Sequence, residues 1–593
     1  MRQAIEPTGS RSQAAGDSTI SALGWAADQI HYDHGVSLYV DGVVNLRDLF
    51  PSIEQADRPD LYRQLIRLYK RVGVRVLDRL RGSYAIAIWD SESRRLLMAV
   101  DPFGTRTLFY SSVGNAFAFT PRLPALMSWD KFQSEIDPNT IYFYLNHAFC
   151  PAPFTIYRGA RRLEPGQWLE WDEGHVRIER YWDMSYPEDP SMPESAAADA
   201  IKQAVEDSVR SHFNATDQLS LYRGAFLSGG TDSSTLVGLL SSMSSEKVRT
   251  FSVGFREAVY NEIDYARIAA RHFSTEAHEY FLSADQALDA IPIIAEAFDE
   301  PFGNSSAIPT YFCLKMAHEA GVNLMFAGDG GDELFAGNER YITEKVFTLY
   351  QKLPKGLRRA TDCMVPLVPD IFPLTKVTSY VQKANLSAVD RFFHYQFYFR
   401  DHAQTYFTND FLNSLDMDFA VRIPAQHYQR VATCDPLNRL LYVDLKLAIG
   451  DNDLFKVNRS ADVFGIQVVY PYLDQNLALI SGKIPSYLKL RGWSKRYIFK
   501  KAFKTLLPPE ILTKKKHGFG LPIGRWLRAH PGFRELARSL LLDQRSMQRG
   551  FFSRNALESL IELHNKDDGS YYGSQIWNVM MLELWHRHHH DKR

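Results

Sequence analysis

The stretch Gly224–Leu240, GAFLSGGTDSSTLVGLL, decides the fold of the second half of this chain. Its first apolar residues predict a buried strand, and the apolar periodicity after Asp232 predicts a helix. Ser228-Gly229-Gly230 forms the turn between them. A glycine turn that leads into a helix leaves backbone N–H groups free to bind an anion, and nearby serine hydroxyls add donors. The stretch therefore predicts a phosphate-binding loop, with the Asp232 carboxylate available to hold Mg²⁺ against the phosphates.

An ordinary strand–helix turn with capping serines is the simpler interpretation. A Walker loop is excluded, because Gly482-Lys483 is followed by Ile484 rather than by serine or threonine. SGGTDSS, residues 228–234, instead resembles the pyrophosphate-binding loop of ATP pyrophosphatases, which cleave ATP between its α- and β-phosphates. That group includes asparagine, GMP, NAD and argininosuccinate synthetases and some tRNA-modifying enzymes.

Length and composition describe an ordinary globular protein. A chain of 593 residues predicts two or three domains. The net charge of −1 gives no electrostatic reason to expect nucleic acid as a partner. No apolar run approaches a membrane span, so we expect no membrane partner. The cysteines are scattered, without CxxC or zinc spacing, which favours a reduced, cytoplasmic setting. They are Cys150, Cys313, Cys363 and Cys434.

Composition also divides the chain. Residues 1–30 are rich in Ser, Ala and Gly and predict a flexible N-terminal arm. Short strands from Val36 onward, with Asp41-Gly42 as a tight turn and another strand near Thr155–Tyr157, predict a β-rich domain over residues 31–186. Pro187, Pro190 and Pro193 predict a linker over residues 187–198. From 199 to 593, strands and helices alternate, which predicts a doubly wound parallel sheet.

A second marked turn, AGDGGDELFAG at residues 327–337, follows a predicted strand. Ligands of doubly wound sheets bind at the carboxyl ends of the strands. Three carboxylates in one glycine-rich turn repel one another unless a cation neutralises them. We therefore expect Asp232 and Asp332 to share Mg²⁺ on pyrophosphate, and the alternative is a solvent-exposed acidic turn.

Four longer segments resemble the synthetase domain of bacterial asparagine synthetases. They are DEPFGNSSAIPTY (299–311), FAGDGGDELFAGNERY (326–341), YPYLD (470–474) and KKHGFGLPIGRWL (515–527). The resemblance implies ATP and Mg²⁺ as cofactors, and it implies roles for residues of the two turns. Adenine and ribose would lie among Leu227, Ser228, Val253 and Gly328, pyrophosphate would bind Ser228, Gly229, Gly230, Asp232, Ser233 and Ser234, Mg²⁺ would bind Asp232 and Asp332, and Asp329 would line the reaction centre.

The first half resembles the N-terminal-nucleophile (Ntn) glutaminase domain of the same family. VDGVVNLRDL (40–49) and RGSYAIAIWDSESRRLLMAVDPFGTRTLFY (81–110) carry this resemblance. In the family, a cysteine after the initiator Met attacks glutamine, and its α-amine is the base. Here that position is Arg2, the family's Arg-His-Arg-Gly-Pro-Asp segment has no counterpart, and its Asn-Gly oxyanion element is Asp41-Gly42. We expect no glutamine hydrolysis.

The synthetase half also departs from the family. The family's Lys-Val-Asp-Arg reads Lys456-Val457-Asn458-Arg459 here. In the family's Glu-Val-Arg-Val-Pro-Phe-Leu-Asp, the glutamate is replaced by Gln467 and the arginine by Val469. We expect these changes, with Tyr470 and Tyr472, to suit a substrate larger than aspartate. The family's catalytic lysine aligns with Arg496, beside Lys495. Arginine keeps its proton at neutral pH but stabilises negative charge, and we expect Lys495 to take the lysine's role.

These features together predict an ATP-dependent ligase. It would adenylate a carboxylate, release pyrophosphate and let an amine attack the acyl-adenylate. Relatives that lost the cysteine include β-lactam synthetases and lasso-peptide cyclases, in which the substrate supplies its own amine. We therefore expect an amide- or lactam-forming ligase of specialised natural-product biosynthesis, with small-molecule or peptide carboxylate and amine substrates. Ammonia-dependent asparagine synthesis and a non-catalytic scaffold are the alternatives, and whether the protein forms a homodimer stays open.

Overall fold

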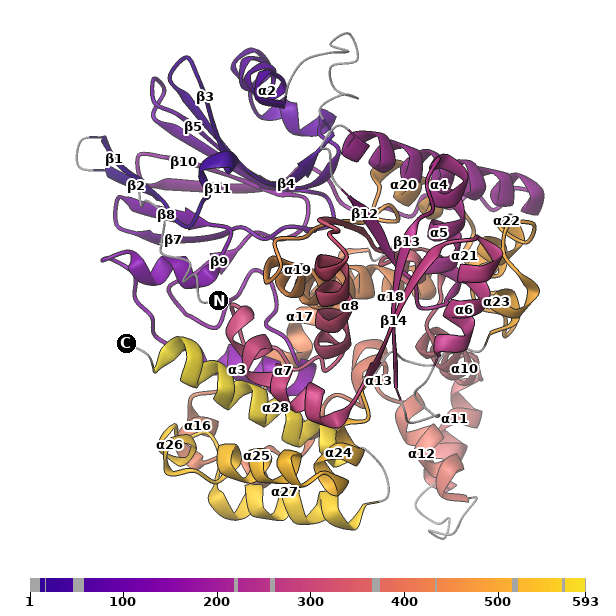
Figure 1. The fold of residues 1–593 in the computed structure, drawn as a ribbon. Helices are drawn as coiled ribbons and strands as arrows, with labels where there is room; N and C mark the ends of the chain where they lie inside the picture. The colour runs from indigo at the N-terminus through magenta and orange to yellow at the C-terminus, as the bar shows by residue number, and fades with distance from the viewer. Residues whose placement is uncertain are drawn as a thin grey trace.

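The structure is a computed structural model of the chain, and it describes all residues except 1–10, 16–17, 46–57, 218–221, 256–261, 365–373, 432–434, 515–520, 568–570 and 592–593. Arg2, Cys434, residues 46–49 of VDGVVNLRDL and residues 515–520 of KKHGFGLPIGRWL thus lie outside the described residues. A β-rich N-terminal domain stands beside an α/β domain, and the last helices form a layer along one side of both (Figure 1).

The N-terminal domain is a sandwich of two sheets. One has the order β11(His175–Arg180)-β10(Gln167–Asp172)-β6(Arg95–Val100)-β5(Gly82–Asp90)-β4(Val36–Val44)-β3(Ile30–Asp33), and the other β1(Arg11–Ala15)-β2(Ser18–Ala22)-β8(Ala116–Thr120)-β7(Phe109–Val113)-β9(Arg161–Arg162). Buried side chains from both sheets, such as Phe117 and Trp171, form the core between them. Helix α2 (Arg58–Val72) covers the outer face of the six-stranded sheet with Leu61, Leu65 and Leu68, which form an apolar stripe along the helix.

Three predictions for this half are wrong. Residues 11–15 and 18–22 are not a flexible arm, because β1 pairs antiparallel with β2 and β2 also pairs in parallel with β8. Asp41-Gly42 is not a turn but continues β4 opposite Ala85 and Tyr84. Gly42 is needed there for close packing, since a Cβ at this residue would lie 2.2 Å from the Ser83 carbonyl oxygen. Thr155–Tyr157 forms only an isolated bridge to Ile136.

The predicted doubly wound parallel sheet is confirmed. Its strands follow the order β14(Glu276–Leu282)-β13(Arg249–Phe255)-β12(Arg223–Phe226)-β15(Leu324–Phe326)-β16(Gln467–Val469), and all its pairs are parallel. The connecting helices include α5 (Thr231–Met243), α6 (Ile263–His272), α7 (Ala284–Ala297) and α8 (Ala307–Glu319). Chain order reverses between β12 and β15, which is where ligands bind in such sheets. Both marked turns follow these two strands.

The two halves interlock more than a linear division implies. Helix α4 begins at Glu194, so the linker is shorter than predicted. Helix α3 (Pro138–His147) comes from the N-terminal half, yet it packs against α17 (Phe419–Arg430) and α28 (Tyr571–Trp585). The Tyr144 hydroxyl donates to the Asn578 carbonyl oxygen at 2.9 Å. Figure 1 shows α3 beside α28 in the C-terminal helical layer.

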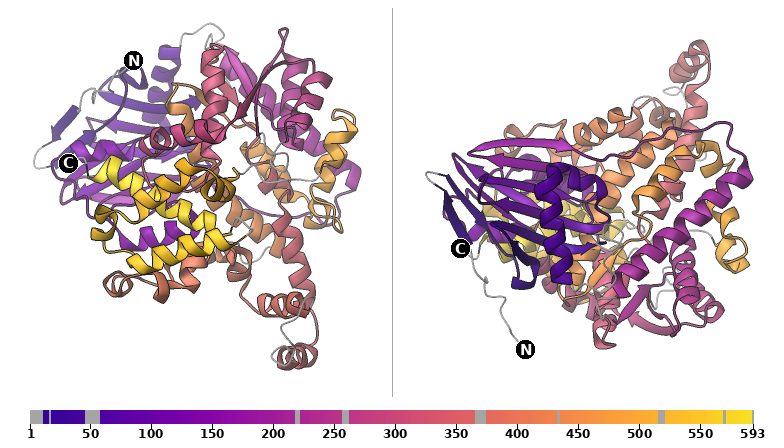
Figure 2. Two further views of the ribbon diagram at one scale, coloured as in Figure 1. Left: turned by 60° about the horizontal axis from the view of Figure 1, so that its bottom comes forward. Right: turned by 90° about the horizontal axis from the view of Figure 1, so that it is seen from above.

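A helical arm extends from the α/β domain. It consists of α10 (Glu339–Gln351), α11 (Lys355–Met364) and α12 (Leu374–Ala384), and α11 and α12 project from the body in each view (Figures 1 and 2). Within the described part of the chain, every helix is too short or too polar to cross a membrane.

Candidate active site

The ends of β12 and β15 open into one cavity of about 800 Å³. Most residues predicted from the sequence line it. They are Leu227, Ser228, Gly230, Asp232, Ser233, Val253, Gly328, Asp329, Asp332, Lys495 and Arg496. The sheet topology explains the convergence, because β12 and β15 are neighbours although nearly a hundred residues separate them in the chain.

Two predicted residues do not line the cavity. Gly229 has φ +65°, and a Cβ there would lie 2.3 Å from the Tyr265 carbonyl carbon, so this glycine lets the loop pass close to α6. Ser234 is fully buried in the first turn of α5, and its Oγ has no hydrogen-bond partner among the described residues. Both residues thus belong to the loop but lie outside the lining of the cavity.

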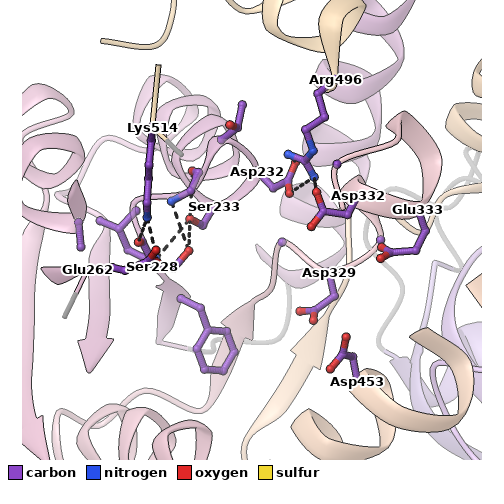
Figure 3. Close-up of a pocket in the computed structure, with 18 of the residues that line it drawn as sticks. Ser228, Asp232, Ser233, Glu262, Asp329, Asp332, Glu333, Asp453, Arg496 and Lys514 are labelled. Carbon is purple, nitrogen blue, oxygen red and sulfur yellow. Dashed lines mark hydrogen bonds and ion pairs between the residues drawn. The ribbon is translucent and has the colours of Figure 1, made fainter. Parts of the chain in front are cut away.

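Two serines of the predicted phosphate loop form hydrogen bonds within the loop. The hydroxyls of Ser228 and Ser233 share a hydrogen bond of 3.1 Å, and the Gly230 N–H donates to Ser228 Oγ at 3.3 Å. Lys514, which sequence reasoning missed, donates to the Ser228 carbonyl oxygen at 3.2 Å and to Glu262 at 3.0 Å (Figure 3). The loop thus joins the N-terminus of α5 to a buried cation, and both attract phosphate.

Arg496 connects the two carboxylates that were predicted to share Mg²⁺. Its guanidinium pairs with Asp232 and with Asp332, as Figure 3 shows. Because both carboxylates contact one planar cation, they lie close enough to share one metal ion, so the residues present fit Mg²⁺ if Arg496 moves aside. In the described part of the chain no three acidic, His or Cys side chains gather as a metal site, so phosphate and water oxygens would supply the other ligands.

A further group of charges lies beyond Asp332. Asp329 faces Asp453, and Lys456 Nζ pairs with Asp453 at 2.6 Å. Burial raises the pKa of Asp329 to about 6, Lys456 opposes the shift and Asp453 adds to it. Burial also raises the pKa of Glu333 well above its usual range. Sequence reasoning missed Asp453 as a site residue, because its position three residues after the buried Gly450 gave no motif to find it.

Lys495 and Arg496 have different partners. Lys495 pairs with Glu339 at the start of α10, whereas Arg496 reaches the metal carboxylates. Arg496 has φ +53°, which turns consecutive side chains in different directions along the cavity wall. The structure therefore gives the two basic residues separate places in one site.

The expectation that the altered positions contact substrate is wrong. Asn458, Gln467, Val469, Tyr470 and Tyr472 are not among the residues that line the cavity. Asn458 donates to the Thr105 carbonyl oxygen of the N-terminal domain and accepts from the Tyr470 hydroxyl at 2.8 Å. The Tyr472 hydroxyl donates to the Asp232 carbonyl oxygen at 3.1 Å. These side chains fill the space behind the site and between the domains.

A second cluster of charges, the interdomain cluster, comprises Arg106, Arg122, Asp299, Arg459 and Asp462. Arg122 donates to Asp299 at 2.8 Å, and Arg459 pairs with the other oxygen of Asp299 at 2.9 Å. Burial raises the pKa of Asp462, but Arg459, Arg122 and Arg106 outweigh it and hold that pKa below its usual value. The cluster joins the loops after β6 and β8 to the α/β domain.

Two groups of the N-terminal domain lie in surroundings that raise their pKa values. Burial raises the pKa of Asp41, although Arg106 opposes the shift. Cys150 is 3% exposed, and burial raises the pKa of its thiol well above the usual value, with Glu300 adding to the shift. A buried neutral thiol is a poor nucleophile.

Comparisons with known proteins agree with this architecture. The model of the asparagine synthase family matches residues 200–587, and that of the glutamine amidotransferase domain matches residues 63–182. Asparagine synthetase [glutamine-hydrolyzing] 1 of Bacillus subtilis is 25% identical over 533 residues, which cover 89% of this chain and 81% of that protein.

Two further relatives widen the comparison. A putative asparagine synthetase [glutamine-hydrolyzing] of Mycobacterium tuberculosis is 28% identical over 526 residues, which cover 87% of this chain and 78% of that protein. Amidase chry2 of Gibberella zeae is 19% identical over 505 residues, which cover 78% of this chain and 73% of that protein. With a glutaminase-like sandwich followed by a synthetase domain that spans residues 200–587, this chain belongs to the asparagine synthase family.

Proposed function

We propose that this protein is an ATP-dependent ligase that adenylates a carboxylate and joins the acyl group to an amine. One observation carries the proposal. A single cavity is lined by most of the SGGTDSS loop, by the carboxylates of Asp232 and Asp332 around one cation, and by the basic side chains of Lys495 and Arg496. Family membership supports amide-forming chemistry that depends on ATP.

The cavity offers a separate wall for each part of ATP. Leu227, Val253 and Gly328 supply apolar and backbone surface for the base and ribose. The β- and γ-phosphates would lie on the loop, where the N-terminus of α5 and Lys514 attract them. Asp232 and Asp332 would hold Mg²⁺, which would neutralise charge on the departing pyrophosphate.

A carboxylate must be activated because oxide is a poor leaving group. An oxygen of the substrate carboxylate attacks the α-phosphorus of ATP, and the bond to pyrophosphate breaks. AMP is then the leaving group of the acyl-adenylate. An amine then forms the C–N bond, AMP departs and the amine loses one proton. Lys495 and Arg496, which line the cavity, would stabilise the developing oxyanion, a contact typically worth about 3 kcal/mol. Asp329 would line this reaction centre.

The amine does not come from glutamine in this proposal. Glutamine hydrolysis in the N-terminal domain would need a reactive thiolate and an oxyanion site. Asp41 places a carboxyl group where the resembled domains have an asparagine. A buried carboxylate would repel a developing oxyanion. An amine-bearing substrate in specialised natural-product biosynthesis therefore replaces glutamine, and glutamate release by the purified protein would contradict this part.

Ammonia-dependent asparagine synthesis is the second candidate. The curated relatives named asparagine synthetase favour it, and so does the finding that Asn458, Gln467 and Val469 do not line the cavity. Incubation with MgATP, aspartate and ammonium separates the two proposals. Asparagine formed at several turnovers per second, an ordinary enzyme rate, would favour this second candidate.

Hydroxylamine provides the main test, because it traps any acyl-adenylate as a hydroxamate. Purified protein would be mixed with MgATP, hydroxylamine and a panel of carboxylic acids. We expect AMP and pyrophosphate in amounts equal to the hydroxamate. ADP and phosphate as the only products would refute the proposal.

A further inference from the structure

Trp493 is unusual among the residues that line the cavity. It is 65% exposed, and few large apolar side chains of the described chain are as exposed. Single exposed apolar residues are common on protein surfaces and need no explanation. This one lies three residues before Arg496, at the mouth of the catalytic cavity, so a bound molecule could cover it.

A rigid turn presents the indole. Arg491 and Ser494 exchange two backbone hydrogen bonds of 3.1 and 2.9 Å, and Gly492 supplies a φ of +58° between them. Lys345 of α10 donates to the Gly492 carbonyl oxygen at 3.0 Å. The turn is therefore fixed at its base from the helical arm, and the exposed tryptophan costs little ordering entropy when a ligand binds.

The charged lining leaves little to bind a second carboxylate of a substrate. The cavity has seven carboxylates and five basic side chains. Four of the basic side chains already have acidic partners, in the pairs Lys456–Asp453, Lys495–Glu339, Arg496–Asp232 and Lys514–Glu262. Lys500 is the remaining basic side chain of this lining, so a second substrate carboxylate, beyond the one that is activated, has few cationic partners beside this excess of carboxylates. An apolar group finds Trp493 and, on α10, Ile342.

We propose that Trp493 determines substrate specificity by packing against the hydrocarbon part of the acyl substrate. The site then selects a carboxylic acid with an aromatic or branched apolar group over a dicarboxylic acid. Nucleotide occupies the wall of Leu227 and Val253, and the acyl group occupies the wall of Trp493. This inference rests on the proposed ligase function and names the substrate class of that site.

Equilibrium binding tests the inference separately from catalysis. Isothermal titration calorimetry would measure 3-phenylpropionate and succinate binding to the full chain with Mg²⁺ and α,β-methylene-ATP. We expect 3-phenylpropionate to bind about tenfold more tightly than succinate, and Trp493→Ala to abolish that difference. Trp493→Phe should retain most of it, because phenylalanine keeps an aromatic face.

Tyr487→Ala is the matched control, because Tyr487 is 54% exposed and does not line the cavity. It should leave both affinities unchanged. Succinate binding as tightly as 3-phenylpropionate, binding of neither acid, or equal effects of Trp493→Ala and Tyr487→Ala would each overturn the inference. Failure of the ligase proposal appears separately, as ADP and phosphate release in the hydroxylamine assay.

Discussion

The two charged clusters of this protein use the same residue types in different surroundings. In the cavity, Arg496 pairs with Asp232 and Asp332 beside about 800 Å³ of open space. In the interdomain cluster, Asp299 accepts both Arg122 and Arg459 and its side chain has no solvent exposure. The first cluster can exchange an internal ion pair for a ligand, whereas the second has every charge committed to protein.

The comparison separates chemistry from architecture. Aspartate and arginine alone identify neither a site nor a structural link, since a buried ion pair contributes little net stability yet is costly to break. What distinguishes the clusters is the glycine-rich loop and the cavity next to one of them. Mutations should therefore affect turnover in the first and folding in the second.

The largest expected effect is on turnover. Asp232→Asn or Asp332→Asn removes a proposed Mg²⁺ ligand and should lower hydroxamate formation at least about 100-fold. The thermal midpoint should change little, because Arg496 keeps its other carboxylate. Asp289→Asn, an exposed residue of α7, is the control and should behave as wild type. Turnover within twofold of wild type would remove these residues from the site.

The next effect is on stability. Asp299→Asn removes the buried anion that half-buried Arg122 and buried Arg459 both contact, and leaves them only Asp462 in common, which should cost about 3–5 kcal/mol of unfolding free energy. Urea unfolding followed by fluorescence measures it. Activity per folded molecule should be retained under native conditions. A stability equal to that of Asp289→Asn would mean that the interdomain cluster is not a structural link.

The pH dependence of stability tests the surroundings of His147, which belongs to neither charged cluster. Burial lowers the pKa of His147 to about 4, against about 6.5 unfolded, although hydrogen bonds to Ala420 and Gln396 oppose the shift. The unfolded chain binds the extra proton, so stability falls as pH drops from 6.5 to 4, by up to about 3 kcal/mol. His147→Phe should reduce this loss and exposed His175→Gln should not. Equal acid sensitivity in both variants would contradict the account.

The smallest effect gives the sharpest comparison. Tyr470→Phe removes the hydroxyl hydrogen bond to Asn458, Tyr472→Phe removes the one to the Asp232 carbonyl oxygen, and each variant should cost about 1 kcal/mol of stability. Only Tyr472 supports the Asp232 backbone, so only Tyr472→Phe should lower kcat/KM, by roughly twofold to tenfold. Equal kinetic effects would show that the two tyrosines do not belong to different regions.

Much of the catalytic half could be predicted because its signals are local. A strand, a glycine turn and a helix lie within Gly224–Leu240, and β15 repeats this pattern before Asp329. The roles of Tyr470 and Asn458 could not be predicted, since they depend on packing against Thr105 of the other half. The β2 strand was missed because four of its five residues are small and its segment is rich in Ser and Ala, which gives little periodicity. Trp493 could not be predicted as a site residue, because it lies in none of the motifs.

The central claim, activation of a carboxylate by adenylation, has one direct measurement. 3-Phenylpropionate labelled with ¹⁸O in its carboxylate would be incubated with the full chain, MgATP and hydroxylamine, and the nucleotide analysed by mass spectrometry. We predict one ¹⁸O in the phosphate of AMP, because the carboxylate oxygen leaves with the adenylate. Hydroxamate formed with the label in inorganic phosphate, or with unlabelled AMP, would contradict the account.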